Sequence, residues 1–138
     1  MQGTVKFLEK ARFEARSGSG HTLVIDGPEA AGGENAGFRP MELMLLSLGG
    51  CMGLDVLLIL RKMRQEVTSY ALNLEGERAE DPPAVYTEVR MEHVFKGPGL
   101  KPESIRRAIE LAETKYCSAY AMFAKTAKVQ NSFRILEE

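Results

Sequence analysis

The stretch Met41–Leu60 constrains the fold most, because it is almost wholly apolar and is preceded by residues that favour the start of a helix. Pro40 suits the first position of a helix, and Glu42 suits the first turn because its charge complements the helix dipole. The pair Gly49-Gly50 interrupts the run, and each glycine costs about 1 kcal/mol relative to alanine in a helix. We therefore expect one or two turns, a break or bend at the glycines, and a second segment from about Gly50 to Gln65.

The same stretch raises the question of a membrane span. It contains Glu42, Asp55 and three glycines, and a carboxylate inside a membrane is costly. Because the second segment is apolar nearly all round until Leu60, we expect a helix that is buried on most sides in a soluble protein. The N-terminal residues MQGTVKFLEKARFEARSG lack the apolar core of a secretory signal, so we expect a cytoplasmic protein with no membrane partner.

Alternating apolar and polar residues on both sides of this stretch predict strands. They occur in TVKFLEKARFEARSG and HTLVID, which are joined by the turn SGSGH and followed by GPEAAGGENAGFRP, expected to be a surface loop without helix. Downstream, VTSYALNLEGERA and AVYTEVRMEHVFKG form a predicted hairpin. The expected shared faces are Tyr70, Leu72 and Leu74 in the first strand, and Val85, Thr87, Val89 and Met91 in the second.

The last third of the chain predicts a helix, a further short helix and one more strand. Pro102 begins the helix, Ser118 is expected to cap a further short helix, and KVQNSFRILEE reads as the final strand. Strands and helices are therefore segregated, which predicts an α+β fold with a mostly antiparallel sheet. The 138 residues, 44% apolar and 27% charged, are typical of a single globular domain spanning 1–138. A net charge of −1 argues against a nucleic-acid partner.

The chain has two cysteines, Cys51 and Cys117. In a reducing cytosol such a pair is more often reactive than a structural staple. Each is expected near the start of a helical segment, where exposed backbone N–H groups lower the pKa of a thiol and favour the nucleophilic thiolate. The alternative is that both are small apolar core residues, since free cysteine is among the most often buried residue types. From the residues alone both interpretations stay open.

The segments RPMELMLLSLGGCMGLDVLLILRKMR and KYCSAYAMFAKTAKV resemble the two cysteine motifs of the OsmC/Ohr family, the osmotically inducible protein C and organic hydroperoxide resistance proteins. The family pattern is a proline, an acidic residue, an apolar helix, and a cysteine eleven residues after the proline, as in Pro40 and Cys51. Its second cysteine lies on a second long helix, the place expected for Cys117. The segments SGHTLVID, PMEL and GGC most resemble a branch of short OsmC-like proteins.

This resemblance implies an intertwined homodimer, with antiparallel sheets around two long central helices and active sites at the subunit interface. It implies a thiol-dependent peroxidase acting in the oxidative stress response, in which Cys51 attacks an organic hydroperoxide and becomes a sulfenic acid. Cys117 then condenses with it to a disulfide, and a dithiol reductant reopens the bridge. The resemblance implies no metal and no bound organic cofactor.

The sequence departs from the family around its catalytic acid. In the family the acid that positions a catalytic arginine directly follows the proline, whereas here Met41 takes that place and Glu42 comes one residue later. One residue is a rotation of about 100° on a helix, so Glu42 is either a site residue or an N-terminal helix acid paired with Arg39. Candidates for the arginine are Arg12, Arg16 and Arg39.

The two histidines and Asp55 are the other candidates for chemistry. His21, His93 and the two cysteines lack the close ligand pairs of a zinc site, and His93 reads as an ordinary sheet residue. Asp55 lies one helical turn after Cys51, so it is either a hydrogen-bond partner in the site or a buried dimer contact.

Two alternative functions remain beside the peroxidase. One is a non-enzymatic dimer that binds an apolar small molecule, and the other is a slow cysteine redox sensor.

Overall fold

The computed structural model describes residues 1–137 and divides into two compact units, Met1–Met44 and Leu45–Glu138. The predicted single domain over 1–138 stays a prediction. The first unit is an antiparallel sheet in the order β1 (Gly3–Glu9), β2 (Arg12–Ser17) and β3 (Thr22–Asp26). A loop follows β3, and the buried Asp26 carboxylate accepts hydrogen bonds from the backbone N–H groups of Glu34 and Ala36. The loop also contains one short 3-10 turn, η1 (Glu29–Ala31), where we expected no helical structure.

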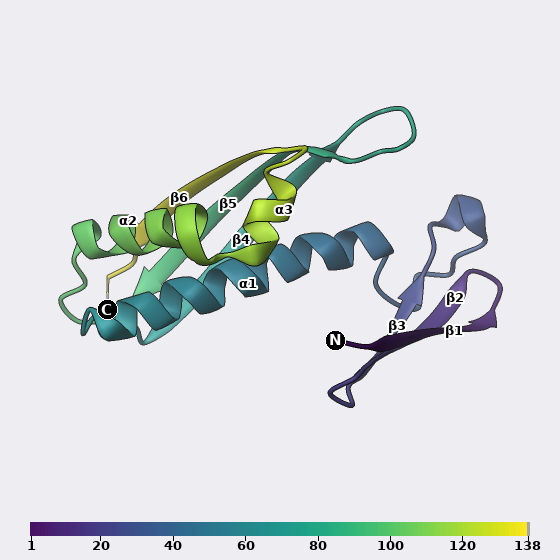
Figure 1. Ribbon diagram of the computed structural model, residues 1–138, viewed down its shortest axis with the longest axis horizontal. Coiled ribbons are helices and arrows are strands. Elements are labelled where there is room, and N and C mark those ends of the chain that lie inside the picture. The colour runs from purple at the N-terminus through teal and green to yellow at the C-terminus, as the bar shows by residue number, and fades with distance from the viewer. Residues whose placement is uncertain (138) are drawn as a thin grey trace. The chain divides into compact units, whose positions relative to one another are not determined.

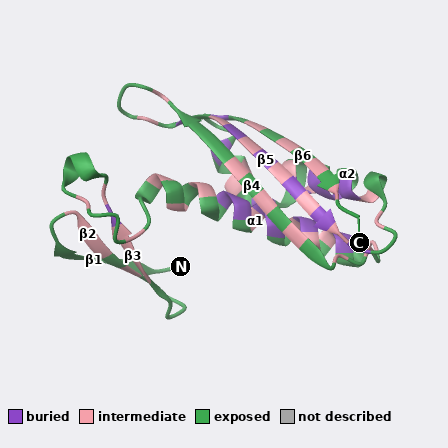
Figure 2. Cartoon of the chain, turned by 180° about the vertical axis from the view of Figure 1, so that it is seen from behind, coloured by how far each residue is buried: buried purple, intermediate pink, exposed green. Residues whose placement is uncertain are grey.

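The second unit is a three-stranded sheet with helices on one face. Strand β4 (Ser69–Arg78) pairs antiparallel with β5 (Tyr86–Lys96), and β5 pairs in parallel with β6 (Lys128–Ile135). The crossover from β5 to β6 carries α2 (Pro102–Leu111), a π-helical segment η2 (Ala112–Tyr116) and α3 (Ser118–Phe123). Figures 1 and 2 show this layer from opposite sides, with α1 (Pro40–Lys62) and α2 in front of the sheet in the first and behind it in the second. The α+β class is confirmed, with one parallel strand pair.

Helix α1 is continuous from Pro40 to Lys62, so the expected break at Gly49-Gly50 was wrong. A side chain at Gly49 would place its Cβ 2.7 Å from Leu74 Cδ1, and one at Gly53 would lie 3.3 Å from Leu72. These two glycines, one turn apart, face β4 and let the helix backbone approach the strand closely. Packing on the sheet therefore offsets the glycine cost that favoured a break.

The two sides of α1 differ in exposure, as its alternating colours in Figure 2 show. One side is buried against the sheet, and the other exposes Leu46, Leu54 and Leu58. By length and composition α1 would pass as a membrane span, yet only 33% of its most apolar window is buried within the chain. The expected burial on most sides is therefore not met by one copy of the chain. The core includes Leu48, Met52, Val56, Leu60, Val89, Met91, Phe95, Ile105, Ala108 and Ala112.

Two local details of the second unit differ from expectation. A bulge places Thr87 outside the regular β4–β5 pairing, so Tyr86 and Val89 are buried while Thr87 and Val85 are exposed. The predicted shared face therefore holds only from Val89 onward, because an extra residue reverses the alternation. By contrast, Tyr70, Leu72 and Leu74 lie on one half-buried face as predicted.

Candidate active site

Cys51 lies in the middle of α1, eleven residues after its first residue. This corrects the expectation that Cys51 begins a helical segment, which depended on a break at the glycine pair. The backbone N–H groups around it are used in the helix, so no helix terminus stabilises its thiolate. Its side chain is half-buried.

Cys117 lies at the bend between the π-helical segment η2 and helix α3. The π-helical segment η2 ends there with the Cys117 N–H donating to the Ala112 carbonyl at 2.8 Å, and Cys117 then caps α3. Its Sγ accepts a hydrogen bond from the Tyr120 N–H at 3.3 Å. The further short helix is present as predicted, but its cap is Cys117 and not Ser118. Such π turns are rare and often occur at functional sites.

The fold brings the two cysteines together with Asp55. Cys51 Sγ, Cys117 Sγ and an Asp55 carboxylate oxygen all lie within 4.8 Å of one another, and both thiols are free. Asp55 and Cys51 share one face of α1, and the bend between α2 and α3 brings the Cys117 sulfur to that face. The pKa of the Cys117 thiol is raised to about 11, mainly by burial and to a smaller extent by Cys51 and Asp55, against the lowering effect of the Tyr120 N–H.

A groove begins at Asp55 and runs along the C-terminal half of α1. It has a volume of about 290 Å³. Its walls are apolar except for Asp55 at one position and Lys62 two turns further along the same helix. The other lining residues are Leu58, Ile59, Met63, Leu111 and Tyr116. An apolar groove therefore begins at the carboxylate that lies beside the sulfur pair.

Glu42 caps the helix on which it lies. Its Oε2 accepts a hydrogen bond from the Arg39 backbone N–H at 3.2 Å, and its Oε1 lies 3.9 Å from the Arg39 guanidinium. This is the helix-acid arrangement that the sequence offered as the alternative to a catalytic role. A catalytic part for Glu42 stays a prediction.

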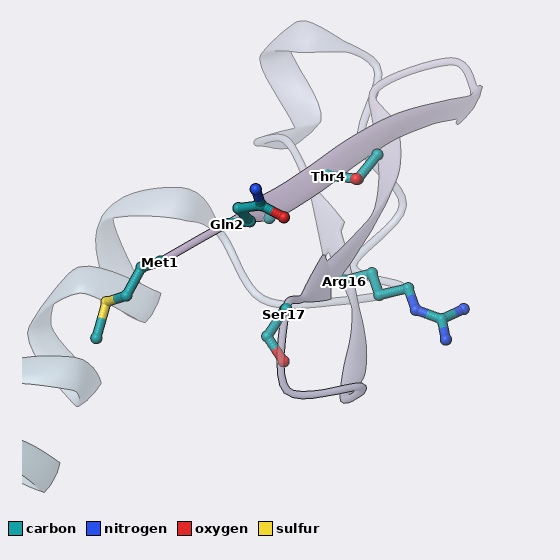
Figure 3. Close-up of a pocket in the computed structure, with 7 residues that line it drawn as sticks. Met1, Gln2, Thr4, Arg16 and Ser17 are labelled. Atoms are coloured by element: carbon teal, nitrogen blue, oxygen red, sulfur yellow. The ribbon is translucent and has the colours of Figure 1, made fainter.

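The other two candidate arginines also lie in the first unit. Arg12 forms ion pairs with Glu9, Glu34 and the buried Asp26, so its charge is already neutralised by carboxylates. Arg16 lines a shallow, open hollow with Met1, Gln2 and Ser17, and Figure 3 shows its side chain extending away from Met1.

A partly buried chain of polar side chains, which sequence reasoning missed, crosses the second unit. Asn131 Nδ2 donates to Glu113 Oε1 at 2.8 Å, which turns Asn131 Oδ1 toward His93 Nε2 at 2.7 Å. His93 Nε2 therefore carries the proton, and Nδ1 accepts from the Tyr70 hydroxyl at 2.7 Å. Burial lowers the pKa of His93 and raises those of Glu113 and Tyr70.

This polar chain ties all three strands to the π-helical segment that precedes Cys117. Tyr70 lies on β4, His93 on β5 and Asn131 on β6, while Glu113 lies in η2. The only signal in the sequence was a histidine on an otherwise apolar strand face. His93 is fully buried, so it is a sheet residue as expected, but with both ring nitrogens in use.

Comparison with known proteins shows which family the sequence and the fold of this chain resemble. Residues 32–132 match the family model described as OsmC-like protein. The chain is 35% identical to Protein YhfA of Escherichia coli strain K12 over 99% of this chain and 98% of that protein. Among solved structures, a hypothetical protein from Aquifex aeolicus VF5 is 31% identical, with a TM-score of 0.87 and coverage of 99% and 96%. The organic hydroperoxide resistance protein OhrB of Bacillus subtilis shares the fold at 16% identity, with a TM-score of 0.65 over 96% of each chain.

Proposed function

Because the chain belongs to the OsmC-like protein family, we propose that it is a thiol-dependent peroxidase that reduces organic hydroperoxides through Cys51 and Cys117. Family membership by itself indicates a redox or peroxide-related function. The observation that carries the finer proposal is the convergence of the two free sulfur atoms within 4.8 Å, although the cysteines are far apart in sequence.

Burial and charge support different parts for the two cysteines. Cys51 is the more exposed, so a peroxide reaches it first. Cys117 is buried, and a thiol with a pKa of about 11 is almost wholly protonated at neutral pH, which makes it a poor first nucleophile. Cys51 is therefore the attacking residue and Cys117 the resolving residue.

In the proposed reaction the Cys51 thiolate attacks the outer peroxide oxygen, the O–O bond breaks, and an alcohol leaves. Cys51 becomes a sulfenic acid. Cys117 then gives up its proton and attacks the Cys51 sulfur, so that the oxygen leaves as water and a disulfide forms. A dithiol reductant returns both thiols by exchange, itself becoming oxidised. The apolar groove beside Asp55 suits the organic part of the peroxide.

The exposed side of α1 supports a homodimer. Leu46, Leu54 and Leu58 follow one another at multiples of four residues, so they form one broad stripe on the helix, and all three are exposed in the single chain. An apolar stripe of this length is a typical buried contact between copies. Leu54→Glu is expected to give a monomer in sedimentation experiments, whereas Lys128→Glu, on an exposed strand position, is expected to leave the dimer intact.

The test follows dithiol consumption with an added organic hydroperoxide such as cumene hydroperoxide. Wild-type protein is expected to turn over, Cys51→Ser to be inactive, and Cys117→Ser to react once and leave a sulfenic acid that dimedone traps. Reaction of Cys51→Ser at the wild-type rate contradicts the assigned roles. Lack of turnover with every hydroperoxide, while both thiols remain titratable, contradicts the peroxidase itself.

A slow cysteine redox sensor is the second candidate, and Asp55 favours it. Asp55 contributes to the raised pKa of Cys117, which lowers the thiolate fraction of this resolving residue and so slows disulfide formation. The rate of disulfide formation separates the two functions. A sensor is oxidised by hydroperoxide at a rate far below that of a peroxidase, and Asp55→Asn is expected to accelerate it.

A further inference from the structure

We propose that Cys51, Asp55 and Cys117 form a binding site for a thiophilic divalent cation such as Zn²⁺. The sequence argued against a zinc site, because the two cysteines and two histidines lack paired spacing. In the fold the histidines take no part: His21 lies on an exposed turn, and both ring nitrogens of His93 are engaged by Tyr70 and Asn131. A carboxylate replaces them beside the two sulfurs.

The spacing of the three ligand atoms is close to that which a tetrahedral ion requires. With Zn–S bonds of about 2.3 Å and Zn–O bonds of about 2.0–2.2 Å, neighbouring ligand atoms on a tetrahedron are about 3.5–3.8 Å apart. The three atoms here all lie within 4.8 Å of one another. Binding therefore needs shifts of about 1 Å or less, which rotation of the Asp55 carboxylate and of the cysteine side chains supplies.

The donor set selects the class of metal. Two sulfurs favour soft or borderline ions such as Zn²⁺ and Cd²⁺ over Mg²⁺ and Ca²⁺, which prefer oxygen ligands. Asp55 and Cys51 lie one turn apart on α1, and Cys117 is fixed by the bend before α3, so the site is held by rigid elements. Three protein ligands leave a fourth position for water, on the side of the groove that Asp55 lines.

Binding is a proton exchange without electron transfer. The ion displaces the protons of the thiols and takes one oxygen of the Asp55 carboxylate as its third ligand, so binding releases thiol protons. A metal-bound sulfur pair can neither form a disulfide nor offer a free thiolate to a peroxide. The ion therefore protects the reduced protein, and an oxidised protein with a Cys51–Cys117 bridge has no site for it.

The experiment titrates the fully reduced whole protein with Cd²⁺ and follows the ultraviolet charge-transfer absorption of the cadmium–thiolate bond. Zn²⁺ is then measured by competition with a chromogenic chelator. We expect one ion per chain, loss of the absorption in Cys51→Ser and Cys117→Ser, and no binding after oxidation. Asp55→Asn is expected to weaken binding by at least about tenfold, since even outer-shell partners of a metal contribute about 10–100-fold.

The matched control is Asp81→Asn, the same substitution in the exposed β4–β5 connection, which is expected to bind like wild type. Binding that is unchanged in Asp55→Asn, a stoichiometry well below one, or equal loss in Asp81→Asn overturns the proposal. Circular dichroism of each variant shows whether a loss reflects misfolding. If the protein binds the metal but shows no peroxidase turnover, the metal site stands and the proposed peroxidase function fails. If it turns over but binds no metal, the metal site fails and the peroxidase function stands.

Discussion

The partly buried polar chain from Tyr70 to Glu113 gives the sharpest stability prediction, through the change Asn131→Ala. The alanine removes the acceptor of the His93 Nε2–H and the donor to Glu113 Oε1 together. His93 is fully buried, so its orphaned N–H costs about 1–3 kcal/mol. Glu113 is only half-buried and regains water, which adds a smaller cost. We expect a total loss of about 2–4 kcal/mol in the free energy of unfolding.

Urea denaturation of reduced protein, at matched protein concentration, measures this loss. Ser132→Ala is the control, because Ser132 is the next residue on β6 and is exposed. We expect it to change stability by no more than about 0.5 kcal/mol. If Asn131→Ala is no more destabilising than Ser132→Ala, then His93 does not depend on Asn131, and the assigned tautomer and the linkage of the strands to η2 are both wrong.

Two further predictions concern α1 and His93. Gly49→Ala and Gly50→Ala gain the same helix propensity, but only the alanine at position 49 meets Leu74. In thermal denaturation, Gly50→Ala should therefore be more stable than Gly49→Ala by about 1–3 kcal/mol. Equal stability would contradict the close contact between helix and strand. Because burial lowers the pKa of His93 below the ordinary value of 6.5, the unfolded chain binds a proton before the folded one as the pH falls. The free energy of unfolding should therefore fall as the pH drops below 6.5, with a slope of up to about 1.4 kcal/mol per pH unit. In denaturant titrations, His93→Gln should remove that slope. The titrations are made at pH values where Glu113 is still ionised, because its raised pKa acts in the opposite sense.

Strand and helix positions were predictable where one periodicity ran without interruption. The face of Tyr70, Leu72 and Leu74, and the helix that begins at Pro102, both follow from spacing alone. The continuity of α1 did not follow, because the glycine cost is local whereas the compensating contact with Leu74 comes from a strand that lies far along the chain. The reversal at Thr87 was also out of reach, since a bulge has no strong signal in the residues.

The candidate site was predictable in its membership and not in its environment. The resemblance to a family selected Cys51 and Cys117, and helical spacing placed Asp55 beside Cys51. The expectation that helix termini activate both thiols was wrong for Cys51, because it depended on the break in α1. The raised pKa of Cys117 comes from burial beneath elements that only the fold assembles.

The hydrogen bond from the Tyr120 N–H to the Cys117 sulfur affects how this cysteine is best replaced. Serine keeps an acceptor at the N-cap of α3, so a serine variant isolates the loss of sulfur chemistry. Alanine removes the acceptor as well, at a cost of about 1 kcal/mol in helix stability. An alanine scan would therefore overstate the part that this thiol plays in catalysis, since some of the lost activity would come from an unravelled turn.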